Sequence, residues 1–232
     1  MIIGIMQPYF LPYLGYWQLI NAVDRYVIYD DVNFIKGGWI NRNRILVQGR
    51  PQYVNVRMEG ASSFKKINEI HVNKDSRWRD NLMKTIEMAY SKAPYFPVVR
   101  SLLSAIFFYE TDNLAKYLIY SIQKICDYLQ IKTEIFISSA LEKSDGLSGQ
   151  DRVLDICRRL SATKYYNAIG GQGLYSKKSF LEHGIELSFL STDNIRYTQF
   201  GLPFVPALSI LDMMMFNSLD TMRQFLSCYS LI

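Results

Sequence analysis

The sequence predicts an α/β protein with a mainly parallel sheet, flanking helices, an inserted hairpin and a helical insertion. Residues 2–31 give the first observation, because an apolar run, a polar loop, a helical pattern and a second apolar run follow one another there. This is the order of a βαβ unit. The strand–loop–helix alternation returns at residues 132–190, and residues 75–130 contain three helical patterns.

The length and composition allow a full hydrophobic core. A chain of 232 residues, about half of them apolar, is long enough for one large domain or two small ones. We expect a single α/β domain with its sheet drawn from residues 1–56 and 131–200 and the helical insertion at about 75–130. This composition excludes a disordered chain.

The opening unit begins with a buried strand. The apolar run at residues 2–6 predicts this strand, which ends at Gln7 and Pro8 because proline has no N–H group for a sheet ladder. A stiff aromatic loop follows. Residues 14–23 then predict a helix, and residues 25–29 predict the second strand.

A hairpin follows this second strand. The segments at residues 45–48 and 53–57 have strand composition and are separated by a turn. The residues that enter the first segment alternate, so that one face would carry the arginines and the other the asparagines of the run Asn41, Arg42, Asn43 and Arg44.

The remaining elements follow from the period of the apolar residues. Helices are expected at residues 77–91, 98–108, 113–129, 150–160 and 176–182. Strands are expected at residues 67–72, 132–138, 164–169 and 185–190, with an added edge strand at 196–200. Ser209 is expected to cap a C-terminal helix, with Asp212 at its third position in the manner of a capping box.

The predicted strands direct polar groups to one edge of the sheet. In open parallel sheets, ligands bind at the carboxyl ends of the strands. Three segments follow predicted strands and would share that edge, namely residues 7–13, 30–33 and 170–173. We therefore expect the ligand site where these segments converge.

Glycines and rings in these segments are candidates for ligand contact. Three glycines lie between a strand and a helix: Gly170, Gly171 and Gly173. Either their N–H groups form an anion-binding nest, or glycine is needed only for a tight turn with positive φ. Tyr9 and Tyr13 have rings that can stack on a base or a sugar, whereas Phe10 and Tyr16 could equally fill the core.

Charged residues of the opening unit are further candidates. Guanidinium groups form bidentate bonds with phosphate or carboxylate, so Lys36, Arg42 and Arg44 are expected to bring positive charge to this edge, with a solvated hairpin as the alternative. Asp30 and Asp31 could bind a cation or a substrate amine, or could end the strand and cap a turn. Neighbouring residues of a strand point to opposite sides, so one carboxylate would face the ligand, and we favour Asp31.

Charge, cysteines and histidines narrow the class of protein. The net charge is +5, from 26 basic and 21 acidic residues, which suits a phosphate-bearing partner but does not indicate nucleic acid. Cys126, Cys157 and Cys228 have no CxxC spacing, so we expect a reduced cytoplasmic protein. His71 and His183 have no ligand-spaced partner, so we expect no metal site. The chain enters a strand without a basic signal segment, and no run of about 18 apolar residues predicts a membrane span.

Several runs of the sequence carry a family resemblance. QPYFLPYLGY is followed by D-x-x-V-I-x-D-D-V-x-F and W-x-N-R-N-R-I, then by APYF, the Gly-Gly pair before Tyr175, and LSILD. This combination covers nearly the whole chain in order and resembles the WbqC-like protein family. Members of that family occur in bacterial polysaccharide (O-antigen type) gene clusters, and some are named for the transfer of glycine to an amino sugar.

The resemblance implies a cytoplasmic transferase that modifies a nucleotide-linked amino sugar, for instance by adding a glycyl group, in surface-polysaccharide biosynthesis. The alternative is a non-catalytic nucleotide-sugar or phosphate-binding protein that assists such a pathway. The expected partner is a phosphate-bearing small molecule. Nucleic acid enters only as a conceivable aminoacyl-tRNA donor, beside a thioester carrier or an adenylate formed in situ, and the sequence indicates no particular cofactor.

This interpretation gives the candidate residues roles. Gln7, Tyr9 and Tyr13 would position the acceptor. Asp31 or Asp30 would orient or deprotonate its amine, since an ammonium group is not a nucleophile. Arginines of the hairpin and the glycine loop would hold phosphates. The remaining residues expected to contact the substrate are Asn33, Lys36, Asn41, Arg42, Asn43, Arg44, Gly170, Gly171, Gly173 and Tyr175.

Overall fold

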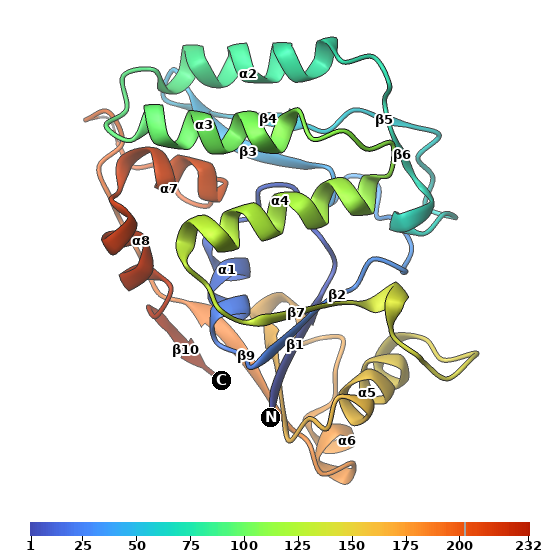
Figure 1. Cartoon of the computed structure of the whole chain (residues 1–232). Coiled ribbons are helices and arrows are strands. Elements are labelled where there is room, and N and C mark those ends of the chain that lie inside the picture. The colour runs from blue at the N-terminus through green and yellow to red at the C-terminus, as the bar shows by residue number, and fades with distance from the viewer. Residues whose placement is uncertain (202) are drawn as a thin grey trace.

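The computed structural model describes residues 1–201 and 203–232, and its centre is a six-stranded sheet (Figure 1). The strand order is β10-β9-β8-β1-β2-β7. The strands are β1 (Ile2–Met6), β2 (Arg25–Ile28), β7 (Glu134–Ile137), β8 (Lys164–Ala168), β9 (Glu186–Thr192) and β10 (Tyr229–Leu231). Every neighbouring pair is parallel except β9 with β10. The predicted α/β class with a mainly parallel sheet is therefore confirmed.

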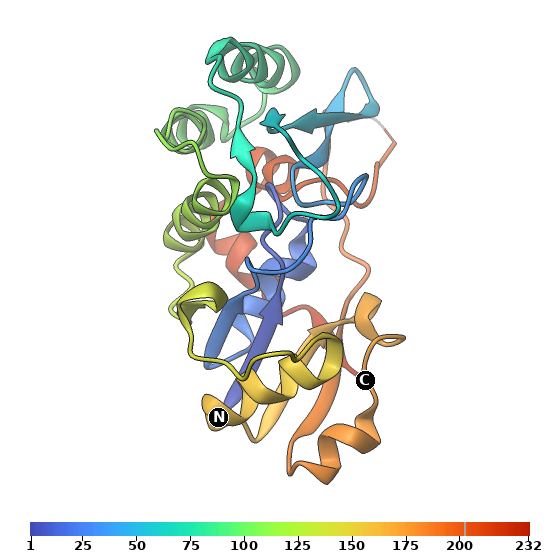
Figure 2. The same ribbon diagram turned by 90° about the vertical axis from the view of Figure 1, so that its right-hand side faces the viewer.

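Helices cover both faces of this sheet. The helices are α1 (Leu14–Asn21), α2 (Arg77–Tyr90), α3 (Phe96–Phe107), α4 (Leu114–Leu129), α5 (Gly149–Arg159), α6 (Lys177–Glu182), α7 (Ile210–Phe216) and α8 (Leu219–Phe225). Helices α5 and α6 pack on one face, and the other helices belong to a larger core on the opposite face. Figure 2 shows α2, α3 and α4 as a column on one side of the molecule.

Alternation along the strands produces these two cores. In β1, Ile3 and Ile5 are buried against α5 and α6, whereas Met6 packs into the larger core. In β2, Val27 belongs to the first group and Ile28 to the second. This is the two-residue period of a strand that is covered on both faces.

The predicted hairpin is present, but it stands apart from the main sheet. Strands β3 (Arg42–Val47) and β4 (Arg50–Asn55) form their own antiparallel ladder. Gln48 and Gly49 connect them and have positive φ values of 48° and 77°. Positive φ at both central residues is the geometry of a type I′ turn, which matches the twist of a two-residue hairpin.

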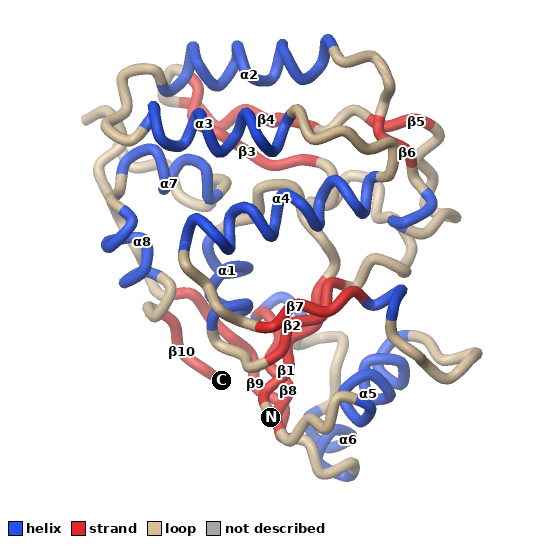
Figure 3. Tube along the Cα trace, viewed as in Figure 1, coloured by secondary structure: helices blue, strands red, loops and turns tan. Residues whose placement is uncertain are grey.

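The predicted helical region at about 75–130 is also present and forms α2, α3 and α4 (Figure 3). The segment expected as a strand at residues 67–72 is instead a short 3₁₀ turn, Ile67–Glu69, followed by β6 (His71–Val72), which pairs with β5 (Met58–Glu59). No helix in the described part of the chain combines the length and apolarity that a membrane-spanning segment needs.

One expectation near the C-terminus was wrong. Residues 196–200 do not form a strand, and β10 is the strand that pairs beside β9. The expected helix after Ser209 is present as α7, and a second helix, α8, follows it because Ser218 starts a new helix and its hydroxyl accepts the N–H of Thr221. The sequence did not predict β10, because a strand of three residues is too short to show the two-residue alternation of apolar and polar side chains.

Candidate functional site

The loop that follows β1 is tied to the hairpin. Its Phe10 N–H group donates to the carbonyl of Ile40 at 3.0 Å. Asn43 on β3 donates its side-chain amide to the carbonyls of Phe10 and Leu11 at 3.2 and 2.9 Å. Asn43 is buried, and a buried amide needs such partners. The side chain of Asn43 therefore anchors the loop.

The start of α7 holds the same loop from the other side. The hydroxyl of Ser209 donates to the carbonyl of Leu11 at 2.8 Å, and the Ser209 N–H donates to the carbonyl of Arg44 at 2.8 Å. Ile210 donates its N–H to the carbonyl of Pro12 at 3.1 Å. Loop, hairpin and α7 are far apart in the sequence, yet their backbones form one scaffold at the sheet edge.

A pocket of about 300 Å³ lies between this scaffold and the carboxyl ends of β1, β8 and β9. Four rings line it: Tyr9, Tyr13, Tyr16 and Trp39. The other lining residues are Met6, Pro12, Gly15, Asn43, Arg44, Ala168, Ile169, Leu190, Thr192 and Ala207. The pocket is at the predicted edge, and predicted residues Tyr9, Tyr13, Asn43 and Arg44 meet in it. Apolar walls with a few polar groups are typical of small-molecule sites.

Arg44 is the one charged residue in the pocket lining among the described residues. Its guanidinium lies 5.7 Å from the ring centre of Trp39 and donates to the carbonyl of Ala207 at 3.1 Å. Its Nε is buried and has no partner within the described residues. A guanidinium held beside rings can bind an anionic group of a ligand.

The other polar residues of the hairpin do not line this pocket. Arg42 donates to the carbonyls of Gly37 and Gly38 and lies 4.6 Å from the ring centre of Tyr53. Lys36 is exposed, and Asn41 donates to the carbonyl of Val56 at 3.3 Å. The predicted alternation is confirmed, because Asn43 is buried while Arg42 and Arg44 are half-buried. Only one of the two arginines reaches the pocket.

The glycine loop lies at the predicted edge, but its glycines do not form the expected left-handed turn. Gly170, Gly171 and Gly173 all lack the positive φ that such a turn needs, and the binding of an anion by their N–H groups stays a prediction. Gly171 has a different reason to be glycine: a Cβ there would lie 2.9 Å from the side-chain nitrogen of Asn167. The following helix, α6, is short and is capped by Ser176.

The remaining candidates of this edge have varied surroundings. Tyr175 packs edge-on against Tyr165, with ring centres 5.8 Å apart. Burial, and to a smaller extent Tyr175, raise the pKa of Tyr9. Gln7 is half-buried and its carbonyl accepts the hydroxyl of Tyr16 at 3.1 Å, while Asn33 is exposed.

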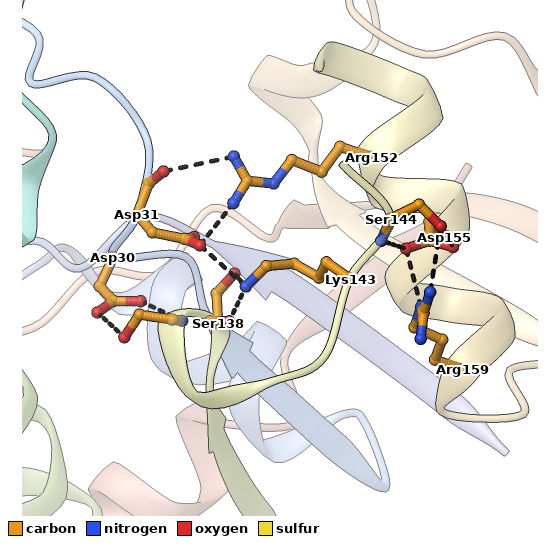
Figure 4. A network of polar contacts seen from close by, with 9 residues as sticks. Asp30, Asp31, Ser138, Lys143, Ser144, Arg152, Asp155 and Arg159 are labelled. Carbon is orange, nitrogen blue, oxygen red and sulfur yellow. Dashed lines mark hydrogen bonds and ion pairs between the residues drawn. The ribbon is translucent and has the colours of Figure 1, made fainter. Parts of the chain in front are cut away.

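The two aspartates after β2 have separate partners (Figure 4). The carboxylate of Asp30 accepts the N–H and the hydroxyl of Ser139 at 2.9 and 2.6 Å. Asp31 instead meets two cations, Lys143 at 2.9 Å and Arg152, on one of its oxygens. Asp30 thus caps the turn after β7, as a structural residue would, and Asp31 lies toward α5.

The environment of Asp31 argues against its expected role as a general base. Burial alone would raise the pKa of Asp31, but Lys143 and Ser138 beside its carboxylate and the charges of Arg152 and Lys143 outweigh it and lower the pKa. A carboxylate with a lowered pKa is a weak proton acceptor near neutral pH. Asp31 also lies on the α5 side of the sheet, while the pocket lies on the α1 side.

Several residues of this edge were not predicted. Lys143 and Arg152 are 112 and 121 residues away from Asp31 in sequence, so no local pattern links them to it. Trp39 and Thr192 reach the pocket through the packing of the loop and of β9, and no local pattern in the sequence indicates that packing either. The one signal was that Lys143 and Arg152 follow the strand expected at residues 132–138, whose carboxyl end also lies at the ligand edge.

Fold and site together define an α/β protein whose mainly parallel sheet carries a ring-lined pocket at the carboxyl ends of its strands. The chain belongs to the WbqC-like protein family, which it matches over residues 7–224. It is similar to the uncharacterized protein Rv1507c of Mycobacterium tuberculosis, with 31% identity over 215 residues, which are 91% of this chain and 92% of that protein. No solved structure matches the chain.

Proposed function

We propose that this protein is a transferase that modifies a nucleotide-linked amino sugar, for instance by adding a glycyl group, in the biosynthesis of a surface polysaccharide. The observation that supports it most directly is the pocket at the sheet edge, which is lined by four rings and by Arg44, whose guanidinium lies beside the ring of Trp39. Rings stack on a base or a sugar face, and a guanidinium binds phosphate. A nucleotide sugar has both kinds of group.

The proposed reaction is an acyl transfer to an amine. The nitrogen of the amino sugar attacks the carbonyl carbon of an activated acyl donor, a C–N bond forms, and the bond to the leaving group breaks. The amine must lose a proton to a base for this attack. No carboxylate or imidazole lines the pocket within the described residues, so the base would come from the donor or from a group that enters with it.

A second candidate function is a binding protein without catalysis, which holds a nucleotide sugar for another enzyme. This function is favoured because no carboxylate or imidazole of the described residues lines the pocket, and because two cations lower the pKa of Asp31. Under this hypothesis the pocket binds its ligand, but no donor gives turnover.

Binding is tested with calorimetry over a series of nucleotide amino sugars, using Arg44→Gln and the matched control Arg42→Gln. Loss of a guanidinium contact to phosphate is expected to weaken binding by about 2–5 kcal/mol. Arg42→Gln should bind like the wild type, because Arg42 is engaged with Gly37 and Gly38. Equal binding by Arg44→Gln and wild type would show that the pocket does not hold the anionic group there.

Turnover is tested separately, by mass spectrometry of the sugar after incubation with glycyl-tRNA, a glycyl thioester, or glycine with ATP. Acylated product with any of these donors supports the transferase. Binding without product from all three favours the carrier.

A further inference from the structure

A cluster of charged residues lies beyond the end of β2, and none of its members lines the pocket. Asp31, Lys143 and Arg152 come from three segments and meet where the carboxyl end of β2 faces the start of α5 (Figure 4). Their side chains are 9%, 12% and 18% exposed. Ion pairs this well buried are expensive to form, and removal of one partner is strongly destabilising.

Lys143 and Arg152, the two cations of the cluster, differ in whether they have N–H donors free for a ligand. Lys143 donates to the carbonyl and hydroxyl of Ser138 as well as to Asp31, so its three N–H groups are engaged. Arg152 uses its two terminal nitrogens on the carbonyl and carboxylate of Asp31. The Nε edge of its guanidinium meets no acceptor in residues 1–201 and 203–232, and the group lies 5.4 Å from the ring centre of Tyr29. A guanidinium has five donors in a fixed fork, so an edge remains for a bidentate partner.

Asp31 also has an unused group. Its second carboxylate oxygen is buried and has no hydrogen-bond partner within the described part of the chain. A buried polar atom without a partner requires an explanation, and one is a ligand donor such as a hydroxyl or amine. The cluster thus presents a donor edge and an acceptor oxygen close together.

The start of α5 adds to the donor side. Arg152 lies in its first turn, and the N–H groups of Gly149, Gln150 and Asp151 meet no acceptor among the residues described. The N-cap residue Ser148 makes no side-chain cap. These N–H groups and the guanidinium lie at the same end of the helix, where the helix dipole favours negative charge.

We propose that Arg152 and the start of α5 form a phosphate subsite, and that the ligand is a sugar phosphate or the sugar diphosphate part of a nucleotide sugar. This deepens the proposed function and rests on it for the identity of the full substrate. The phosphate binds the free edge of Arg152, Lys143 adds its charge, and the free oxygen of Asp31 accepts a hydroxyl or amine of the sugar. Asp31 then has two roles, because one of its oxygens fixes Arg152 and Lys143 and the other binds the sugar.

Inorganic pyrophosphate is the probe, measured by calorimetry and by the shift in melting temperature. Wild type is expected to bind it saturably, and Arg152→Gln should bind at least tenfold more weakly. Arg159→Gln is the matched control, because Arg159 is on the same helix and pairs with Asp155 at 2.9 Å, away from the start of α5. Arg44→Gln reports separately on phosphate held in the pocket, and a loss of pyrophosphate binding in Arg44→Gln with none in Arg152→Gln would assign the anion to the pocket and overturn this subsite.

Arg152→Lys keeps the proposal testable if Arg152→Gln does not fold. A lysine keeps the charge but lacks the fork, so this variant is expected to fold and to bind severalfold more weakly than wild type. Asp31→Asn should melt at a lower temperature than wild type without pyrophosphate and gain more from its addition, since both cations then lack their counter-anion. No binding by wild type, equal binding by Arg152→Lys, or equal losses in Arg152→Gln and Arg159→Gln would overturn the subsite.

The outcomes also separate the subsite from the transferase. Pyrophosphate binding that depends on Arg152, without turnover of any nucleotide amino sugar, supports the subsite and contradicts the transferase. Turnover that is unchanged in Arg152→Gln supports the transferase and overturns the subsite.

Discussion

Asp31 and Arg44 show which properties of a single residue can be predicted from the sequence. Both were expected at the ligand edge because they follow or enter predicted strands, and both lie there. The partners of Asp31 were not predictable, because Lys143 lies in the loop after β7 and Arg152 lies on α5, and their place beside β2 depends on the order of strands in the sheet. The position of a side chain in a strand is local information, whereas its pKa depends on contacts that are distant in sequence.

The ion pairs of Asp31 lead to a prediction about stability and pH. Asp31→Asn removes the anion from two well-buried cations and is expected to lower the free energy of unfolding at pH 7 by about 3 kcal/mol. The folded pKa of Asp31 is lowered, so its contribution is complete above its unfolded pKa of about 3.9 and is lost as the pH falls through the folded value. The difference between variant and wild type should therefore narrow below about pH 4.

Urea unfolding of both proteins between pH 3 and pH 8 measures this difference. Glu134→Gln serves as the control, because Glu134 pairs with Arg25 at the surface with 59% of its side chain exposed. Such pairs contribute about 0–1 kcal/mol. A difference for Asp31→Asn that stays constant down to the lowest pH would contradict the assigned cause.

At the scale of an element, α1 depends on one glycine. A Cβ at Gly15 would lie 2.7 Å from the hydroxyl of Thr192, and that hydroxyl donates to the side chain of Gln18 at 2.7 Å. Glycine therefore allows α1 to approach β9 closely, although glycine is a poor helix former. The sequence predicts the helix but not the reason for its glycine.

Gly15→Ala is expected to destabilise the protein by about 1–3 kcal/mol through overpacking, despite the better helix propensity of alanine. The melting temperature of Gly15→Ala measures this effect, and Gly173→Ala is the control, because a Cβ at Gly173 meets nothing within 4 Å and its φ is not positive. A melting temperature of Gly15→Ala at or above that of wild type would show that α1 can shift away from β9.

Helix α7 shows how tertiary contacts override a local motif. Ser209 caps the helix as expected, but the side chain of Asp212 does not return to the cap. Its carboxylate is fully buried and accepts the hydroxyls of Tyr90 and Tyr197 at 2.7 and 2.6 Å and the amide of Gln199 at 2.6 Å. The spacing of a capping box was present, but stronger donors from other segments take its carboxylate.

Asp212→Ala would leave these three donors without their acceptor. Each unsatisfied buried group costs about 1–3 kcal/mol, so the free energy of unfolding should fall by about 3–5 kcal/mol. Asp212→Asn keeps one oxygen acceptor and should lose clearly less. Chemical denaturation compares the two variants, and equal stability of both would indicate that water replaces the carboxylate.

At the scale of the whole molecule, the class of fold was predictable and the order of strands was not. The strand–helix alternation at residues 2–31 and 132–190 indicates parallel pairing, because parallel neighbours need crossover connections. The hairpin was also predictable, since its turn is local. The place of β10 beside β9 was not, because pairing at an edge is decided by what remains uncovered after the helices have packed.

Strand β10 gives the last prediction, because it covers the edge of β9. The two strands pair from Tyr229 with Thr192 to Leu231 with Leu190, and Ile232 exchanges N–H bonds with Phe189 at 2.9 Å in both directions. Deletion of residues 229–232 would expose the backbone of β9, a strand of seven residues, as an open edge. Open edges pair with other chains, so the truncated protein should self-associate as its concentration rises and lose about 2–4 kcal/mol of stability, at about 1 kcal/mol per hydrogen bond.

Light scattering coupled to gel filtration measures the association. The double variant Leu231→Ala, Ile232→Ala is the control, because it keeps the backbone ladder and should remain like the wild type. Association of the control to the same extent would assign the effect to the lost apolar side chains instead of the exposed edge.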